Sequence, residues 1–243
     1  MCYHYSIART AEEIALHYNI KLKLKGVNPD PLFYHVNGFN FERLPVIYQD
    51  KTYSELKLDL IQWGMIPVWI KGEEEALKIR SMTLNARAET VDSKPAYRSA
   101  FRYRPCLVPA TGYFEWMHYK GEKYPFYIFI PDRPVFSFAG IWEEWVNPDT
   151  GEILRSYSVV TCKANPLTAK IHNTKNRMPV ILDSGSEIEW LDISAGRDDR
   201  KKLLKPYSAE EMSAYTVSKL ITSRKDDSNR PEVLEHQSYP QLK

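Results

Sequence analysis

The second residue of the chain is a cysteine whose position allows an unusual chemistry. A small side chain at position 2 normally permits removal of the initiator Met1, and Cys2 would then be the N-terminal residue. Its α-amine, with a pKa of about 8, is partly neutral at pH 7 and can attack an aldehyde to form a Schiff base. The neighbouring thiol can then close a five-membered thiazolidine ring. Cys2 is therefore a candidate aldehyde trap, and the alternative is an incidental residue after the start methionine.

Two further side chains could move protons in such a reaction. Glu115 lies between bulky apolar residues in Gly112–Trp116, and a carboxyl group in such surroundings can transfer a proton near neutral pH. Histidine titrates near neutrality, so His172 could donate or accept a proton in such a reaction. The residues alone leave two plainer alternatives open, a solvent-facing glutamate on a strand and a structural histidine.

Asn85 and Arg87 alternate along one extended segment, so their side chains share a face. Asn85 can donate and accept hydrogen bonds and could orient the Cys2 amine, whereas Arg87 offers a bidentate grip on phosphate. Glu89 has the same parity and is expected to pair with Arg87. A turn-capping asparagine and a surface arginine are the alternatives.

Basic and aromatic side chains could bind a nucleic acid strand. One stretch of eleven residues without an acid contains Lys94, Arg98, Arg102 and Arg104. This basic cluster predicts a phosphate-binding stripe whose contribution weakens with salt. Trp63, Trp69 and Trp116 are candidates for stacking on unpaired bases. A solvated helix face and tryptophans packed in the core are the alternatives.

The composition limits the possible functions. The chain has 243 residues, with 33 Lys and Arg against 31 Asp and Glu, so its net charge is only +2. A hydrophobic content of 43% is typical of a globular protein and excludes a disordered chain, a collagen-like chain and a coiled coil. Because the charges nearly cancel, any nucleic-acid binding must come from a local patch.

The sequence also indicates where the protein works. No apolar stretch approaches the roughly 20 residues of a membrane-spanning helix, and the N-terminus lacks the pattern of a signal peptide. The three cysteines form no Cys-x-x-Cys motif, which argues against a disulfide framework or a cysteine zinc site. We therefore expect a cytoplasmic protein that does not contact a membrane.

Runs rich in β-branched and aromatic residues, separated by turn signals, predict the elements that position these side chains. The expected strands are Leu44–Tyr48, Leu58–Met65, Cys106–Val108, Gly112–His118, Tyr124–Ile130, Val135–Trp142 and Tyr157–Thr161. Their short connections predict antiparallel pairing. The expected helices are Thr10–Tyr18, Pro95–Tyr103 and Asn165–His172, with capping boxes at Ser186-x-x-Glu189 and Ser208-x-x-Glu211.

These elements predict a single α+β domain over residues 1–243, with a mostly antiparallel β-sheet or barrel core and peripheral helices. The stretch Val27–Asn40 carries Pro and Gly and is expected to be a loop. The tail after about residue 223 is polar, and the sequence leaves open whether it is flexible.

Several motifs, taken in order along the chain, closely resemble the SRAP family, named for an SOS-response-associated peptidase domain. The segments that carry the resemblance are Met1–Cys2, Trp63–Pro67, Thr83–Thr90, Lys94–Arg98, Arg104–Trp116, Phe138–Trp142, Ile171–His172 and Arg177–Leu182. The resemblance implies the SRAP fold and a protein that recognises abasic sites in single-stranded DNA. Such a protein links to the lesion covalently through its N-terminal cysteine and shields it. A self-processing peptidase activity, which removes the residue ahead of the cysteine, and an AP-lyase activity accompany this linkage.

The resemblance also implies roles for single residues. The implied catalytic residues are Cys2, Asn85, Glu115 and His172. The implied DNA-binding residues are Arg87, Trp69, Lys94, Arg98, Trp116, Thr161 and Arg177, with Trp69 as a wedge beside the lesion. No metal and no organic cofactor is implied. The expected partner is single-stranded DNA containing abasic sites, with single-strand/duplex junctions left open. We expect a monomer that associates with the nucleoid when it is bound to DNA.

The chain departs from the family pattern at the edge expected to face DNA. The family commonly begins Cys-Gly-Arg, whereas this chain reads Cys2-Tyr3-His4. The aromatic residue that often follows the wedge is replaced by Ile70. Residues 173–176 also lengthen the spacing between the family's histidine and Arg177, which leaves the role of Arg177 open.

Two other functions stay open at this point. One is a cysteine peptidase or amidohydrolase that uses Cys2, with His172 as its base, without crosslinking to DNA. The other is a non-catalytic single-strand-binding module that uses only the basic cluster and the tryptophans.

Overall fold

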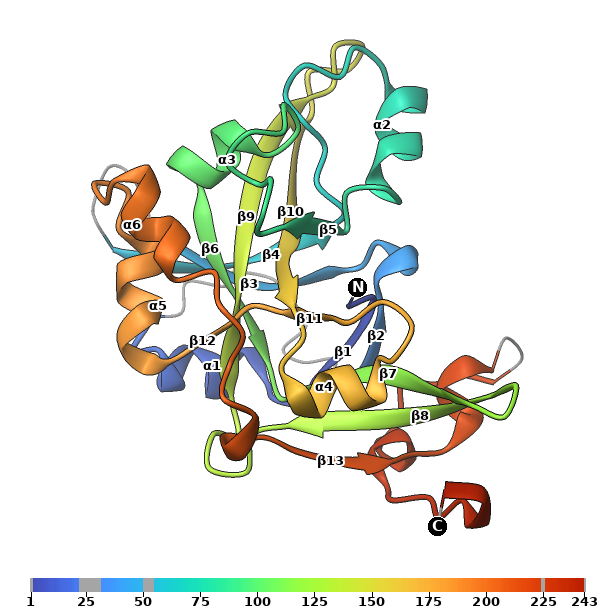
Figure 1. Ribbon diagram of the computed structural model, residues 1–243. Coiled ribbons are helices and arrows are strands. Elements are labelled where there is room, and N and C mark those ends of the chain that lie inside the picture. The colour runs from blue at the N-terminus through green and yellow to red at the C-terminus, as the bar shows by residue number, and fades with distance from the viewer. Residues whose placement is uncertain (1, 22–31, 50–54, 224–225, 243) are drawn as a thin grey trace.

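Two β-sheets form the centre of the protein and bring its N-terminus beside strands from the middle of the chain (Figure 1). The structure, a computed structural model, describes residues 2–21, 32–49, 55–223 and 226–242. The first sheet has the strand order β13-β8-β7-β1-β2, and its pairings are antiparallel. Its strands are β1 (His4–Ile7), β2 (Phe33–Asn37), β7 (Gly112–Tyr119), β8 (Glu122–Phe129) and β13 (Ser213–Thr216).

The second sheet has the order β11-β10-β4-β3-β6-β9-β12, with β5 paired to β10 beside this path. Its strands are β3 (Arg43–Gln49), β4 (Leu56–Trp63), β5 (Asn85–Arg87), β6 (Pro105–Ala110), β9 (Phe136–Val146), β10 (Ile153–Lys163), β11 (Arg177–Pro179) and β12 (Ile181–Leu182). Most pairs are antiparallel as predicted, but β10 runs parallel to β4 and to β5. Several elements separate these strands in sequence, so their connections are long enough for the crossover that parallel strands need.

Short helices surround the sheets and complete the predicted α+β class, which is confirmed. They are α1 (Ala11–His17), α2 (Glu73–Arg80), α3 (Arg98–Tyr103), α4 (Pro166–Ile171), α5 (Ser184–Leu191) and α6 (Arg197–Lys202). Short 3₁₀ turns are η1 (Gly38–Asn40), η2 (Ala209–Glu211), η3 (Lys219–Thr222), η4 (Pro231–Leu234) and η5 (Pro240–Leu242). In the part of the chain that the structure describes, no helix is both long and apolar enough to span a membrane.

Side-chain caps begin α1, α4 and α5, although not all where the sequence pattern placed them. The predicted capping box at Thr10 is present, with its hydroxyl accepting from the Glu13 N–H at 3.1 Å. The predicted box at Ser186 is wrong, because Asp183 caps α5 by accepting from the Ser186 N–H at 2.8 Å. The box at Ser208 is also wrong, since its side chain makes no capping hydrogen bond and a 3₁₀ turn follows.

Two further boundaries differ from the prediction. Helix α3 begins at Arg98 and not at Pro95, because the preceding residues form turns in which the Lys94 carbonyl accepts from the Tyr97 and Arg98 N–H groups. Part of the predicted loop Val27–Asn40 is strand β2 followed by η1, and residues 27–31 lie outside the described residues. Strand β2 forms because it pairs with β1, a long-range contact that the local sequence does not show.

Large aromatic side chains fill the core directly beneath the N-terminus. The Trp63 ring is fully buried, packs edge-on against Tyr5, and donates its indole N–H to the Leu84 carbonyl at 2.8 Å. The Tyr5 and Tyr157 hydroxyls lie 3.0 Å apart in the same region. The prediction that Trp63 stacks on bases is therefore wrong, because its ring belongs to the interior.

Gly112 allows β7 and β8 to pack closely at the start of their pairing. A Cβ atom at this position would lie 2.3 Å from the Tyr127 ring, so any side chain there forces a shift. The glycine also pairs with Ser6 of β1. Strand β7 is thereby held between β1 and β8, and this placement fixes the direction of its later residues, Glu115 and Trp116.

The polar C-terminal tail is packed against the first sheet in its described residues 226–242. Val233 is fully buried, and His236 forms a β-bridge with Val217 just after β13. The Asn229 side-chain oxygen accepts from the Tyr34 N–H of β2 at 2.8 Å. The tail therefore contacts both β2 and the end of β13, which are the two outer strands of this sheet.

Candidate active site around Cys2

Cys2 lies fully buried just before β1, where β5 approaches from the second sheet. The Asn85 amide donates to the Cys2 carbonyl at 2.8 Å, and the Asn85 carbonyl accepts from the Tyr97 hydroxyl at 3.2 Å. The Asn85 side-chain oxygen is buried and has no hydrogen-bond partner among the described residues. Asn85 thus holds the backbone of Cys2 and presents a spare acceptor beside it. The predicted removal of Met1 concerns a residue outside the described part of the chain.

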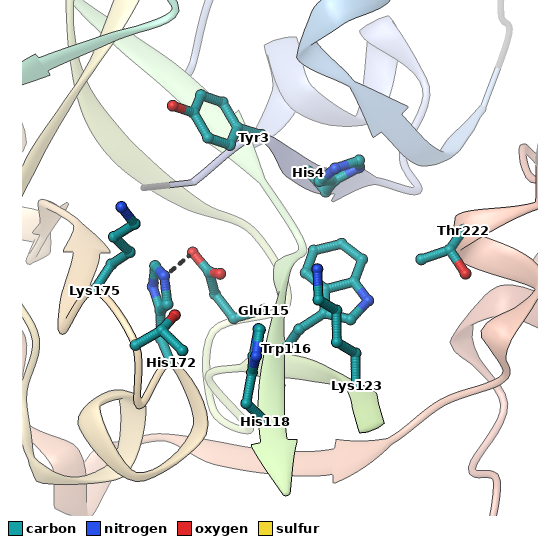
Figure 2. Close-up of a pocket in the computed structure, with 10 residues that line it drawn as sticks. Tyr3, His4, Glu115, Trp116, His118, Lys123, His172, Lys175 and Thr222 are labelled. Carbon is teal, nitrogen blue, oxygen red and sulfur yellow. Dashed lines mark ion pairs between the residues drawn. The ribbon is translucent and has the colours of Figure 1, made fainter. Parts of the chain in front are cut away.

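Glu115 and His172 form a buried pair (Figure 2), and the charge of Glu115 acts on the Cys2 thiol. Glu115 is 4% exposed and His172 is 6% exposed, and Glu115 Oε1 lies 3.2 Å from His172 Nδ1. The Arg177 carbonyl lies 2.9 Å from the same nitrogen. A carbonyl oxygen can only accept, so Nδ1 carries the proton and a neutral ring keeps its lone pair on Nε2. The pair therefore has a defined tautomer, with Nε2 as the atom that can exchange a proton with a ligand.

The loop between α4 and β11 keeps this geometry despite its added length. Asn173 is tied to β7 in both directions, accepting from the His118 N–H at 3.1 Å and donating to the His118 carbonyl at 2.8 Å. Asn176 adopts a left-handed conformation with φ of 51°, which asparagine tolerates well. The longer spacing that set this chain apart therefore still delivers the Arg177 carbonyl to His172.

The thiol of Cys2 is held in its protonated form. Burial raises its pKa above the ordinary value, and the negative charge of Glu115 raises it further. The thiol donates weakly to the His4 carbonyl, with Sγ and O 3.6 Å apart. Because a thiol is a much weaker nucleophile than a thiolate, this sulfur needs a neighbouring base before it can form a bond.

A cavity of about 460 Å³ opens beside the Glu115–His172 pair, within the usual range for ligand sites. Its lining residues are Tyr3, His4, Glu115, Trp116, His118, Lys123, His172, Thr174, Lys175 and Thr222. Lys123 and Lys175 give its rim positive charge, and Trp116 provides an aromatic wall. No group of three or more His, Cys, Asp or Glu side chains could hold a metal ion in the ranges that the structure describes.

The predicted DNA-binding residues fall into two groups. Trp116 lines the cavity, where its ring meets the His4 ring edge-on with centroids 4.8 Å apart. Trp69 is 49% exposed on the segment between β4 and α2, and its neighbour Ile70 is buried against a separate apolar cluster. Arg87 is exposed at the end of β5. Burial raises the pKa of the nearby Tyr3 hydroxyl, and the positive charge of Arg87 acts to lower it.

The basic cluster is smaller than the sequence indicates. Lys94, Arg98 and Arg102 are exposed, and none of them lines the cavity. Arg104 instead forms an ion pair of 2.5 Å with Glu143, whose side chain is buried. Arg104 therefore does not belong to a phosphate-binding stripe.

Arg177 pairs with Glu89, a residue that the sequence pattern paired with Arg87. The expected pair of Glu89 with Arg87 is wrong, because Glu89 forms a bidentate contact with Arg177 at 2.5 and 3.1 Å. Strand β10 lies between β5 and β11, and Arg177 reaches across it. Arg177 Nη2, which contacts Glu89 Oε2, also donates to the Thr161 hydroxyl at 3.2 Å.

Thr161 is fully buried, which does not fit the direct DNA contact that the resemblance implied. Its hydroxyl donates to the Ala86 carbonyl at 3.3 Å and accepts from Arg177. Thr161 therefore links β5 and Arg177 through two hydrogen bonds of its hydroxyl.

Residues that sequence reasoning missed include Lys123, Lys175 and His35, whereas His4 was noted as a departure at the edge expected to face DNA. Lys123 pairs with His118 across β7 and β8, so strand parity could have placed both beside Trp116. His4 Nδ1 lies 2.9 Å from His35 Nε2, a contact between β1 and β2. It depends on a strand that was expected to be loop.

Comparison with known proteins decides the family. The model of the SOS response associated peptidase (SRAP) family matches residues 1–224. The chain belongs to the SRAP family. Over 184 residues, 75% of this chain and 78% of the relative, it is 38% identical to the abasic site processing protein YoqW of Bacillus subtilis. It is also 32% identical over 209 residues to the abasic site processing protein HMCES of Gallus gallus, covering 77% of this chain and 60% of HMCES.

Solved structures agree with this assignment. The crystal structure of a protein from Bacteroides thetaiotaomicron has a TM-score of 0.90 and 39% identity to this SRAP chain. The match covers 98% of this chain and 100% of the other. The resemblance drawn from the sequence motifs is thus confirmed at the level of family and fold.

Proposed function

We propose that this SRAP chain recognises abasic sites in single-stranded DNA and links to them through a thiazolidine at Cys2, once Met1 has been removed. The observation that carries the proposal is that Asn85 holds the Cys2 carbonyl while Glu115, paired with His172, acts electrostatically on the Cys2 thiol. The names of the relatives YoqW and HMCES, both abasic site processing proteins, support the same lesion.

The reaction begins at nitrogen. A ring-opened abasic sugar exposes an aldehyde, and the neutral α-amine of Cys2 adds to its carbon. The spare oxygen of Asn85 can accept an N–H of this amine and orient its lone pair. His172 Nε2, when protonated, can donate to the sugar oxygen and keep the ring open, because the Nδ1 contacts are unchanged by that protonation. Loss of one water molecule gives the iminium.

The second bond forms at sulfur. The Cys2 thiol adds to the iminium carbon, and its proton passes to the Glu115 carboxylate, which already acts electrostatically on that thiol. The electron pair of the C=N bond returns to nitrogen and gives a neutral thiazolidine. The overall change joins amine, thiol and aldehyde with release of one water, so atoms and charge balance.

The same site accounts for the accompanying activities. Before ring closure, the iminium acidifies the adjacent sugar carbon, and removal of that proton expels the 3′ phosphate by β-elimination, which is a lyase reaction. Hydrolysis of the Met1–Cys2 bond, the self-processing peptidase step, requires a base beside the same backbone and would use Glu115 or His172. Trp116 and the exposed Trp69 are the aromatic surfaces offered to unpaired bases.

A cysteine peptidase that acts on other substrates fits the geometry less well. Such enzymes use a thiolate activated by a neighbouring imidazole. Here burial holds the thiol protonated, and His172 directs Nδ1 to Glu115 and Arg177.

One crosslinking assay tests the proposal. The protein is mixed with an oligonucleotide that carries one abasic site, denatured, and analysed for a shifted band. We expect a heat-stable adduct that Cys2→Ala abolishes and that Cys106→Ala retains, because Cys106 is buried and does not line the cavity. A borohydride-reduced site, which has no aldehyde, should give no adduct.

Other outcomes would overturn the proposal. An adduct with the Cys2→Ala protein, or with the reduced site, excludes the aminothiol mechanism. Peptide turnover without an adduct indicates the peptidase, and salt-sensitive binding that denaturation abolishes indicates a simple binding module.

A further inference from the structure

A chain of hydrogen bonds that the proposed reaction does not use runs from the C-terminal tail to the cavity. Ser228 Oγ lies 2.7 Å from His35 Nδ1, and His35 Nε2 lies 2.9 Å from His4 Nδ1. His4 lines the cavity beside Trp116 and Glu115. Ser228 belongs to the tail beyond residue 224, where the family model ends. The chain therefore connects a segment outside the family's common domain with the site.

The two imidazoles are fixed by packing as well as by hydrogen bonds. Their rings stack with centroids 5.1 Å apart, and His4 also meets Trp116 edge-on while His35 meets Phe114. Asn229 holds the end of the chain, since its side chain accepts from the His35 N–H at 3.3 Å and donates to the Leu32 carbonyl at 3.1 Å. Neither ring is free to turn without breaking these contacts.

Both rings are neutral at physiological pH. Burial lowers the pKa of His4 to about 3, with a contribution from His35, and lowers that of His35 to about 4. The charged and titratable groups around them are Asp227 beside His35 and, in the cavity, Glu115, His118, Lys123, His172 and Lys175. A neutral imidazole carries one proton, so the chain has only two possible directions.

The two directions differ in whether His4 Nε2 is a hydrogen-bond donor or an acceptor. If the Ser228 hydroxyl donates to His35 Nδ1, then His35 Nε2–H donates to His4 Nδ1, and His4 Nε2 carries a proton. In the reverse direction His4 Nε2 has a lone pair. The phosphodiester oxygens of a DNA strand only accept hydrogen bonds, so the first direction alone lets His4 bond to the phosphate backbone.

We propose that Ser228 and His35 are positioning residues that hold His4 with its Nε2–H directed into the cavity, where His4 binds a phosphodiester oxygen of the DNA strand beside the lesion. This inference rests on the proposed function for the class of ligand. His4 supplies an uncharged donor, so its contribution differs from that of Lys123 and Lys175, which weakens with salt. The C-terminal tail therefore contributes, through Ser228, to the affinity for the DNA strand.

Two measurements test this inference. The first is long-range ¹⁵N–¹H NMR of the histidine side chains, which identifies the protonated ring nitrogen. We expect the proton of His4 on Nε2 in the complex with an undamaged single-stranded oligonucleotide. The second is reversible binding of that oligonucleotide by Cys2→Ala protein, which cannot form the adduct. Ser228→Ala should weaken this binding about 3- to 10-fold, as expected for one misoriented hydrogen bond.

Controls separate positioning from a general effect on the tail. Ser228→Thr keeps the hydroxyl and should restore binding, whereas Ser238→Ala removes an exposed serine from the same tail and should leave binding unchanged. In a His4→Ala background, Ser228→Ala should have no further effect, because it acts through His4. A single methylphosphonate placed at each linkage in turn identifies the phosphodiester oxygen that His4 binds. At that linkage the methylphosphonate should weaken binding by the wild type, but it should weaken binding by Ser228→Ala much less, because that variant has already lost the hydrogen bond.

The inference is overturned if the His4 proton resides on Nδ1 in the complex, or if Ser228→Ala binds as tightly as the wild type. Should Ser228→Ala destabilise the tail, His35→Gln, which can still donate to His4 Nδ1, must bind better than His35→Ala. Failure of the proposed function is distinct, because it shows as an absent adduct in protein that still binds the undamaged strand. Wild-type protein that binds no strand overturns both.

Discussion

Replacing Glu115 by glutamine tests whether its carboxylate moves protons in the reaction. The side chain is 4% exposed, and Oε1 lies 3.2 Å from His172 Nδ1. Glutamine has nearly the same shape, and its amide oxygen can still accept from Nδ1, so the fold should survive. In the proposed reaction the substitution removes the group that accepts the proton of the Cys2 thiol. We expect thiazolidine formation at pH 7 to slow by roughly 10²-fold, about 2.7 kcal/mol, the lower end of the range for general acid–base catalysis.

Loss of the Glu115 charge also has an effect that would speed the reaction, because it changes the pKa of the Cys2 thiol. The charge of Glu115 helps to raise the pKa of the Cys2 thiol, so glutamine lowers that pKa and makes thiolate more accessible. Burial is the larger cause of the raised pKa and persists in the variant. Loss of the acceptor should therefore dominate at pH 7. The ratio of the wild-type rate to the variant rate should shrink toward pH 9, where hydroxide can take the thiol proton.

Single-turnover kinetics with two quenches measures both steps. Denaturant alone reports the stable adduct, and cyanoborohydride traps the iminium that precedes ring closure. If Glu115 accepts the thiol proton, the trapped iminium should accumulate in Glu115→Gln. Glu122→Gln is the matched control, because Glu122 lies on the same hairpin but pairs with Lys219 at the surface at 2.9 Å. Wild-type rates for Glu115→Gln across the whole pH range would refute the assigned role.

Three further predictions concern binding and stability. Trp69→Ala, at a 49% exposed position, should weaken single-strand binding by about 1–3 kcal/mol without changing the melting temperature, as titration with an undamaged oligonucleotide would show. Gly112→Ala should destabilise the fold by about 1–3 kcal/mol in urea unfolding, because its Cβ would lie 2.3 Å from the Tyr127 ring. Acid should destabilise the protein from pH 6.5 down to about 4 through His35 and about 3 through His4, because the unfolded chain binds protons that these histidines exclude when folded. Each histidine contributes a slope of up to about 1.4 kcal/mol per pH unit, which His35→Gln should reduce, and an unchanged slope would contradict this account.

The sequence predicts those parts of the fold that local patterns govern. Asn165 caps α4 by accepting from the Thr168 N–H at 2.8 Å, and that helix delivers His172 as expected. The apolar neighbours of Glu115 correctly indicate a buried strand. In both cases the signal lies within a few residues of the side chain it positions, so one sequence is sufficient.

The remaining parts depend on contacts between distant segments. Asn85 reaches Cys2 only because β5 runs parallel to β10, a pairing that short connections could not reveal. Glu89 pairs with Arg177 because β10 places β5 and β11 on its two sides. Strand parity could not give the partner of Glu89, because Glu89 lies in the turn after β5 and parity says nothing about which strand comes next in the sheet.

The state of Cys2 determines the order of the two bond-forming steps in the proposed reaction. Burial keeps its sulfur protonated and weakly nucleophilic, so the amine must attack first and the sulfur must wait for the more electrophilic iminium carbon. From that iminium two paths lead on, closure of the ring or loss of a proton from the sugar and cleavage of the strand. A base that removes the thiol proton favours closure, and a base that removes the sugar proton favours cleavage. The position of the Glu115 carboxylate relative to these two protons therefore decides whether the site protects a damaged strand or cuts it.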